Sequence, residues 1–176
     1  EHDYILKGNL IKWNPAIKSA ADKAALWEAL RTDRIDVVAT DHAPHTLQEK
    51  EHSYFKAPSG GPLVQHSLTA MLEMSQKGLI SVEKVIEKMC HTPADLFRID
   101  RRGYIREGYY ADLVMIDPAH SWVVSPENIL YKCGWSPFDG MEFSHRVMAT
   151  FVNGNLVYAN GDIVSAIQGK RIKFKT

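Results

Sequence analysis

The sequence has few cysteines and no long apolar run. Its two cysteines, Cys90 and Cys133, lie 43 positions apart with no second thiol near either, which predicts neither a cysteine zinc site nor a disulfide framework. No stretch approaches the ~20 apolar residues that span a bilayer, and the first residues lack the charged and apolar regions of a signal peptide. We therefore expect a cytoplasmic protein with no membrane partner.

The sequence also has no excess charge of either sign. Its 21 Lys and Arg balance its 21 Asp and Glu, so no overall field attracts nucleic acid or an anionic membrane. The most basic stretch, residues 170–175, is short and terminal, and we expect a solvated tail there. With 45% hydrophobic and 24% charged residues, the composition is that of a globular protein. A small molecule is the expected binding partner.

The first hundred residues show an alternation of β and α patterns. Residues 10–13 predict a short strand that ends before Pro15. Ser19 predicts a helix start, followed by an apolar helix face over residues 23–30. Residues 35–40 are rich in β-branched side chains and predict a buried parallel strand. Such a strand–helix–strand order is typical of an α/β fold with helices outside a parallel sheet.

The remaining sequence predicts three further helices and then β structure. The helices are expected over residues 67–77, after Ser81, and from Thr92-Pro93. From about residue 99 the pattern changes, and strands are expected over residues 112–117, 122–124, 146–152 and 156–159. The last two flank Asn153-Gly154, which is a strong hairpin signal because both residues tolerate positive φ.

The segment Asp-His-Ala-Pro-His at residues 41–45 carries the clearest chemical signal. Asp41 would lie just past a strand end, which is the catalytic face in (β/α)8 barrels. A carboxylate there can bind zinc and move a proton, and His45 can reach the same pocket. The alternative is that Asp41 caps a turn and the histidines are surface residues. The long loop over residues 42–62 favours a functional interpretation.

Residues 41–45 in their setting resemble a known family. Together with residues 35–40 before them, and with residues 49–50 and 57–60 after them, they are similar to the eighth-strand region of bacterial-type dihydroorotases in the amidohydrolase superfamily. The resemblance implies reversible, zinc-dependent hydrolysis of the cyclic amide of dihydroorotate to N-carbamoyl-aspartate, a step of de novo pyrimidine biosynthesis.

Two further segments extend the resemblance to nearly the whole chain. Residues 12–18 resemble the seventh-strand segment of these enzymes, and residues 103–114 resemble the return of the chain into a small β-sandwich. The implied fold class is α/β: the C-terminal part of a (β/α)8 TIM-like barrel followed by a β-sandwich segment. We expect residues 1–98 to hold the last two βα units and residues 99–176 to hold the sandwich segment, because a complete barrel takes about 250 residues.

The resemblance also implies roles for individual residues. Asp41 would be a zinc ligand and the general acid and base, Asn14 would hydrogen-bond the substrate ring, and His45 would contact the substrate carboxylate. Backbone groups of Ser59 and Gly60 would close over the bound ring. Two zinc ions in the complete active site would supply hydroxide at neutral pH, and a carboxylate would carry the proton to the leaving nitrogen.

Other interpretations of these residues stay open. Asn14 is also a plausible turn cap before Pro15, and the glycines at 60 and 61 also suit a plain turn. Residues 61–66 depart from the family pattern, so the residues that close over the substrate are not fixed. The alternative functions are a related dihydropyrimidinase, hydantoinase or allantoinase, and a non-catalytic homologue that serves as a scaffold. His42 is expected to pack or hydrogen-bond beneath the metal site.

Most metal ligands of the superfamily are missing from these 176 residues. The sequence contains no His-x-His pair, and one carboxylate cannot hold two zinc ions, since each needs about four ligands. The first residue is Glu1 rather than a methionine. We therefore expect a partial chain that requires the N-terminal part of the barrel, and we allow for a homodimer.

Overall fold

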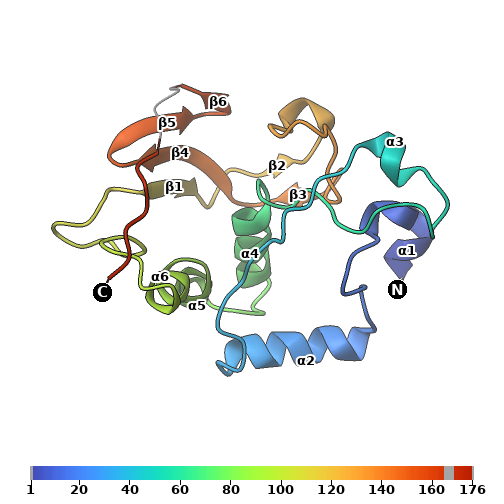
Figure 1. The fold of residues 1–176 in the computed structure, drawn as a ribbon, viewed down its shortest axis with the longest axis horizontal. Helices are drawn as coiled ribbons and strands as arrows, with labels where there is room; N and C mark the ends of the chain where they lie inside the picture. The colour runs from blue at the N-terminus through green and yellow to red at the C-terminus, as the bar shows by residue number, and fades with distance from the viewer. Residues whose placement is uncertain (1, 165–168, 176) are drawn as a thin grey trace.

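The computed structural model describes residues 2–164 and 169–175. Helices occupy the first part of the chain and strands the second, and in Figure 1 the strands lie above α2, α5 and α6 with α4 between them. The helical elements are α1 (His2–Lys7), η1 (Gly8–Ile11), α2 (Ala20–Arg31), α3 (Leu47–Lys50), α4 (Ser67–Gln76), α5 (Val82–Ile86), the π-helical turn η2 (Glu87–His91), α6 (Thr92–Leu96) and η3 (Pro126–Asn128).

The strands form two antiparallel sheets. The larger has the order β1-β4-β5-β6, and the smaller pairs β2 with β3. Their bounds are β1 (Leu113–Asp117), β2 (Trp122–Val123), β3 (Glu142–Phe143), β4 (Arg146–Val152), β5 (Asn155–Ala159) and β6 (Asp162–Ile163). The hairpin predicted at Asn153-Gly154 is confirmed, with φ of 52° and 84° at these residues and Val152 paired with Asn155.

The predicted helix starts are confirmed by their caps. The Ser19 side chain accepts a hydrogen bond from the amide of Asp22, whose carboxylate accepts from the backbone of Ser19 in return. The Ser81 side chain caps α5 through the amide of Lys84. These starts are predictable because a cap is a contact between residues three positions apart.

Both strands expected in the first forty residues are wrong. Residues 10–11 instead form the end of η1, and the amide of Lys12 bonds back to the carbonyl of Asn9. Residues 35–40 have no regular secondary structure and are partly exposed; no described strand pairs with them, and Val38 donates only to the carbonyl of Lys88. A β-branched run favours extended backbone, whereas a strand also needs a neighbour to bond its edge.

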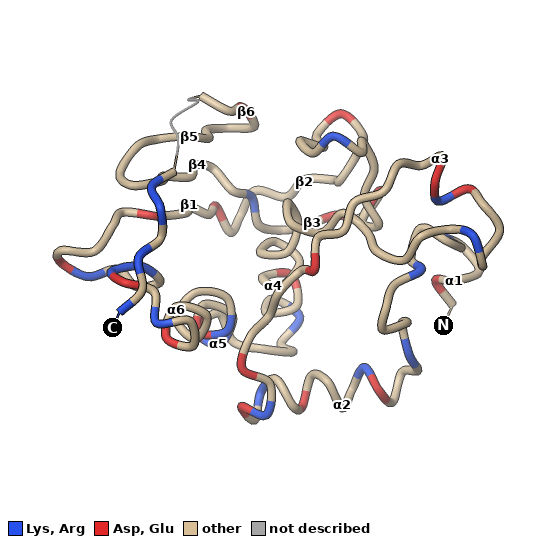
Figure 2. Tube along the Cα trace, in the orientation of Figure 1, with Lys and Arg blue, Asp and Glu red and all other residues tan. Residues whose placement is uncertain are grey.

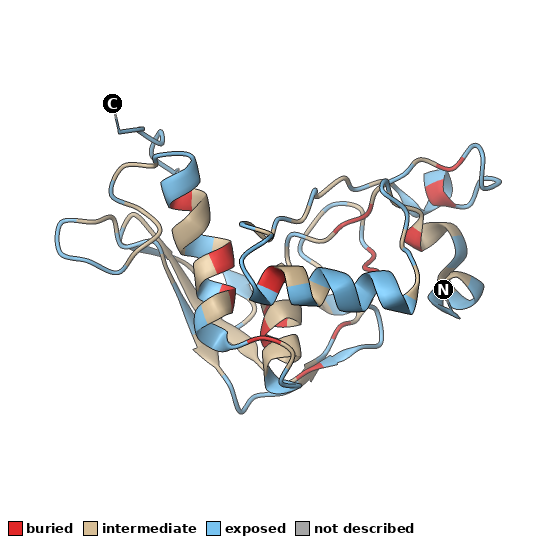
Figure 3. Ribbon diagram, turned by 90° about the horizontal axis from the view of Figure 1, so that it is seen from below, coloured by how far each residue is buried: buried red, intermediate tan, exposed pale blue. Residues whose placement is uncertain are grey.

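Two clusters of buried side chains hold these elements together. The first joins α2, α4 and α5 through Leu30, Leu72, Ile80 and Val85. The second surrounds the fully buried ring of His66, which contacts the aromatic rings of Trp122, Tyr131, Phe138 and Phe143. The expected apolar face of α2 is confirmed at Leu30 and Trp27, which belong to or pack against the first cluster, but not at Leu26, which is 58% exposed. Figure 3 shows that α2 is exposed along most of its length.

Charges of both signs are distributed along the chain. Figure 2 shows basic positions gathered near the C-terminal end. There, Phe174 forms an isolated antiparallel bridge with Ile99, and the exposed side chains of Lys173 and Lys175 flank it. This is the solvated basic tail that the sequence predicts. No helix within residues 2–164 and 169–175 has the length and apolar character to cross a membrane.

Candidate active site

Asp41 lies in a segment without regular secondary structure, beside the loop at residues 59–63. Its φ is 43°, in the left-handed region that Asp and Asn tolerate better than most residues. The amide of Ala43 donates to the carbonyl of Gly61 across 3.3 Å, which fixes the two segments against each other. The Asp41 carboxylate is exposed and has no hydrogen bond or ion pair with any residue the structure describes. It is therefore available to a ligand.

A cavity of about 420 Å³ brings together four of the residues that the sequence singles out. They are Asn14, Asp41, Ser59 and Gly60, from three segments of the chain. The rest of the lining is Trp13, Pro15, Thr40, Ala43, Gly61 and Leu63. Pockets with a few convergent polar groups are the usual form of a small-molecule site. The turn interpretation of Asn14 and the glycines does not by itself account for this convergence.

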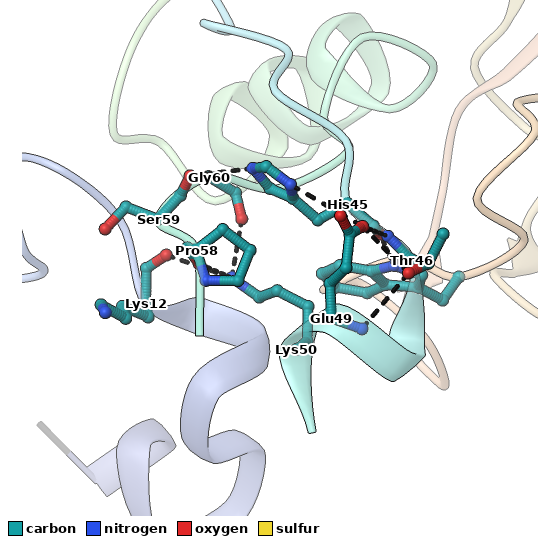
Figure 4. Close-up of polar contacts among 9 residues, drawn as sticks. Lys12, His45, Thr46, Glu49, Lys50, Pro58, Ser59 and Gly60 are labelled. Atoms are coloured by element: carbon teal, nitrogen blue, oxygen red, sulfur yellow. Dashed lines mark hydrogen bonds and ion pairs between the residues drawn. The ribbon is translucent and has the colours of Figure 1, made fainter. Parts of the chain in front are cut away.

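His45 lies at the border of a second cavity of about 480 Å³. That cavity is lined by His42, Pro44, His45, Thr46, Glu49, Leu130, Tyr131, Lys132 and Cys133. The structure thus does not place His45 in the lining of the Asp41 cavity. Its ring nevertheless touches that cavity's wall, because Nε2 lies 3.1 Å from the carbonyl oxygen of Ser59 (Figure 4).

The helix α3 begins directly after His45. The Thr46 side chain accepts from the amide of Glu49, and the Glu49 carboxylate accepts from the amide and hydroxyl of Thr46. The bonds from Thr46 hold the pKa of the Glu49 carboxyl below its ordinary value. Glu49 is therefore charged near neutral pH, and one of its oxygens lies 4.0 Å from Nδ1 of His45. A charged carboxylate thus lies beside the His45 ring.

The glycines of the loop are required by close packing. Gly60 has a φ of 121°, and a Cβ there would lie 2.7 Å from the Cβ of Ala43. A Cβ on Gly61 would lie 2.6 Å from Nε1 of Trp13. Contacts this short force the neighbours to move, so only glycine lets the loop lie this close to residues 13 and 43.

The ring of His42 supports the same loop from the other side. Its Nδ1 accepts hydrogen bonds from the amides of Leu63 and Val64 at 3.1 and 3.2 Å. The expectation that His42 forms hydrogen bonds is confirmed, and its place beneath a metal site stays a prediction. Trp135, to which the sequence assigns no role, also contacts this segment, because its Nε1 donates to the carbonyl of His45 across 2.7 Å and its side chain is buried. A buried tryptophan in a loop is the signal that could have drawn attention to it.

The described residues can supply one ligand to a metal rather than a complete site. No group of three His, Cys, Asp or Glu side chains gathers in the part of the chain that the structure covers. The unpartnered carboxylate of Asp41 is a suitable oxygen ligand for zinc. Asp41 can thus serve as one ligand of a zinc ion, and the remaining ligands would have to come from outside the described residues.

Comparison with known proteins identifies the family. The model of the amidohydrolase family matches residues 8–157. A dihydroorotase of Halobacterium salinarum is 39% identical over 94% of this chain, and one of Pyrococcus furiosus is 32% identical over the same share. A dihydroorotase of Clostridium acetobutylicum is 37% identical over 90% of the chain. The chain spans only 37–39% of the length of these relatives.

Solved structures agree with the sequence comparison. The L-hydantoinase (dihydropyrimidinase) of Arthrobacter aurescens superposes with a TM-score of 0.86 at 31% identity, over 93% of this chain and 38% of that one. The D-hydantoinase of Bacillus sp. AR9 gives a TM-score of 0.80 at 27% identity, over 89% of this chain and 36% of that one. From the fold, the cavity around Asp41 and these matches, we conclude that the chain belongs to the amidohydrolase family.

Proposed function

We propose that this chain is the C-terminal part of a dihydroorotase. The whole enzyme would reversibly hydrolyse the cyclic amide of dihydroorotate to N-carbamoyl-aspartate in de novo pyrimidine biosynthesis, in the cytoplasm. The observation that carries the proposal is the convergence of Asn14, Asp41, Ser59 and Gly60 on one cavity. Relatives named dihydroorotase, at 32–39% identity over 94% of this chain, support the choice of substrate.

The fold of the whole enzyme forms part of this proposal. Residues 1–98 would be the last two βα units of a (β/α)8 barrel, and residues 99–176 would be the C-terminal β-sandwich segment. The fold shared with the hydantoinase of Arthrobacter aurescens, at a TM-score of 0.86 and 31% identity, supports this assignment. The N-terminal part of the barrel would be the required partner, and a homodimer is compatible with this arrangement.

In the proposed reaction, Asp41 has two roles. It would be one of the zinc ligands, and its carboxylate would take a proton from the attacking water and pass it to the leaving ring nitrogen. Two bound zinc ions would acidify that water and polarise the amide carbonyl. The exposure of Asp41 and the absence of a described partner suit both roles.

The other residues would hold the substrate. The Asn14 side chain offers a donor and an acceptor to a ring amide, and the backbone of Ser59 and Gly60 would close over the ring. His45 would contact the substrate carboxylate through Nδ1, since Nε2 already donates to Ser59. Donation from both nitrogens at once requires a protonated ring.

A related cyclic amidohydrolase is the second candidate, because the hydantoinase of Arthrobacter aurescens shares the fold at 31% identity. The full-length protein should be assayed with dihydroorotate, dihydrouracil, hydantoin and allantoin. The proposal predicts that kcat/KM is highest for dihydroorotate. A higher value for any of the other three would overturn the choice of substrate, and no turnover of any of them would favour a non-catalytic scaffold.

A further inference from the structure

Lys50 is a buried lysine that the proposed chemistry does not use. It is the last residue of α3, and its side chain is 2% exposed. Its Nζ donates to the carbonyl oxygens of Gly60 at 2.9 Å, Pro58 at 3.0 Å and Lys12 at 3.3 Å, as Figure 4 shows. We propose that Lys50 is a positioning residue that holds the backbone of residues 58–60 in the wall of the Asp41 cavity. This inference deepens the proposed function and rests on it.

Three consecutive carbonyls of the loop are held by the segment that carries Asp41. Lys50 binds the carbonyls of Pro58 and Gly60, and His45 binds the carbonyl of Ser59 between them. Because α3 follows directly after residues 41–45, these bonds tie the loop to the same segment as Asp41. The side chains of Lys50 and His45 thus add to the backbone bond between Ala43 and Gly61 in setting the position of the loop relative to Asp41.

Lys50 also connects the loop to the segment that precedes Asn14. The carbonyl of Lys12 accepts both from Lys50 Nζ, at 3.3 Å, and from the amide of Gly60, at 2.9 Å. Three segments line the cavity, at residues 13–15, 40–43 and 59–63. Lys50 bonds the chain at Lys12 beside the first segment and at Pro58 and Gly60 in the last, and it follows the second along the chain. Removal of its ammonium group would loosen all three contacts at once.

Lys50 bonds only carbonyl oxygens of the loop, so it does not occupy the loop's amide donors. The amides of Ser59 and Gly61 donate to no residue within the described ranges, and both residues line the cavity. A substrate acceptor in the cavity could take these N–H groups. Their direction depends on the peptide planes at residues 58–60, and Lys50 fixes those planes through their carbonyls.

The surroundings of Lys50 are unusual for a lysine. Within the described chain its ammonium has no carboxylate partner and is solvated by carbonyl dipoles instead. Burial, together with the nearby ammonium of Lys12, lowers the pKa of Lys50. A buried charge is costly unless it is hydrogen-bonded. A hydrophobic residue of similar length would fill this space at lower cost, which favours a role for the hydrogen bonds themselves.

The test uses the full-length protein with Lys50→Met, which keeps the length of the side chain and removes the ammonium. Lys50→Gln retains a neutral donor, and Lys56→Met is the control, since Lys56 is an exposed lysine of the same loop. Hydrogen–deuterium exchange of the Gly60 amide should accelerate about tenfold in Lys50→Met, as expected for the loss of a charge-assisted hydrogen bond. KM for dihydroorotate should rise by a similar factor with a smaller change in kcat, and Lys50→Gln should lie between.

The inference is overturned if Lys50→Met leaves the exchange of Gly60 or the KM at the level of Lys56→Met. It is also overturned if exchange rises equally in α4, because that outcome indicates general destabilisation. Should the methionine variant not fold, the same criteria apply to Lys50→Gln. If the unmodified protein does not hydrolyse dihydroorotate, the proposed function fails, and the exchange at Gly60 alone decides on Lys50.

Discussion

The ring of His45 and the backbone of Ser59 are joined by a hydrogen bond of 3.1 Å from Nε2 to the carbonyl oxygen. The resemblance implies that both residues contact the substrate, and the structure shows that they contact each other. His45 lies on one side of the loop and Ser59 faces the Asp41 cavity on the other. His45 therefore has two proposed roles, one toward the substrate carboxylate and one toward the loop.

We predict that His45→Ala in the full-length enzyme mainly weakens substrate binding. The change removes the contact to the carboxylate and the support of Ser59, so KM for dihydroorotate should rise by about tenfold or more while kcat changes less. Steady-state kinetics measure both values. His52→Ala is the matched control, since His52 is an exposed histidine of the same loop. Equal KM values for the two variants would contradict the role of His45.

We predict that Gly60→Ala destabilises the protein by more than about 1 kcal/mol. A methyl group there meets Ala43 at 2.7 Å and also requires a φ of 121°. Gly140→Ala isolates the conformational effect, because Gly140 has a φ of 75° with nothing within 4 Å of its Cβ. Chemical denaturation gives the free energies of unfolding. A loss for Gly60→Ala no greater than that for Gly140→Ala would exclude the close contact as a cause.

We predict that the protein loses stability at acidic pH because the ring of His66 is buried. Burial lowers its pKa from 6.5 to about 4, so the unfolded chain binds a proton between these values and the folded chain does not. The free energy of unfolding should therefore fall as pH drops from about 6.5 to about 4, by up to about 1.4 kcal/mol per pH unit. The His66→Gln variant, which does not titrate in this range, should show a smaller slope. An unchanged slope would assign the acid sensitivity to other groups.

Metal removal tests the proposed zinc chemistry. The full-length protein should contain about two zinc ions per chain, as a bridged two-metal site requires. Dialysis against a chelator should abolish hydrolysis of dihydroorotate, and added zinc should restore it. Elemental analysis together with the assay gives both quantities. Full activity in a protein shown to be free of metal would refute this part of the proposal.

The features that the sequence predicted well are local ones. The cap at Ser19 and the hairpin at Asn153-Gly154 depend on residues within a few positions of each other, so a short sequence pattern predicts each of them. The strand expected at residues 35–40 was wrong because pairing depends on a distant neighbour, which the described chain does not provide. Local pattern thus indicates backbone shape more reliably than it indicates pairing.

The candidate site also contains features that the sequence predicts and features that depend on distant contacts. The residues at 14, 41, 59 and 60 were named from a resemblance, and the structure brings them to one cavity. Lys50 is part of the resemblance, but the sequence assigns it no role, because a lysine beside a glutamate in a polar loop is usually solvated. Lys50 is buried because the loop at residues 58–60 passes over its side chain, and no periodic pattern in the sequence predicts the course of that loop.

The turnover of Asp41→Asn in the full-length protein tests the central claim most directly. Asn keeps the shape of Asp and tolerates the φ of 43°, so thermal unfolding should be unchanged. The loss of the proton carrier should reduce kcat for dihydroorotate by about 10²- to 10⁴-fold. The control is Asp36→Asn, an exposed aspartate of the preceding segment, which should keep its turnover. Near-normal turnover in a folded Asp41→Asn protein would contradict the assignment of Asp41 as the catalytic carboxylate.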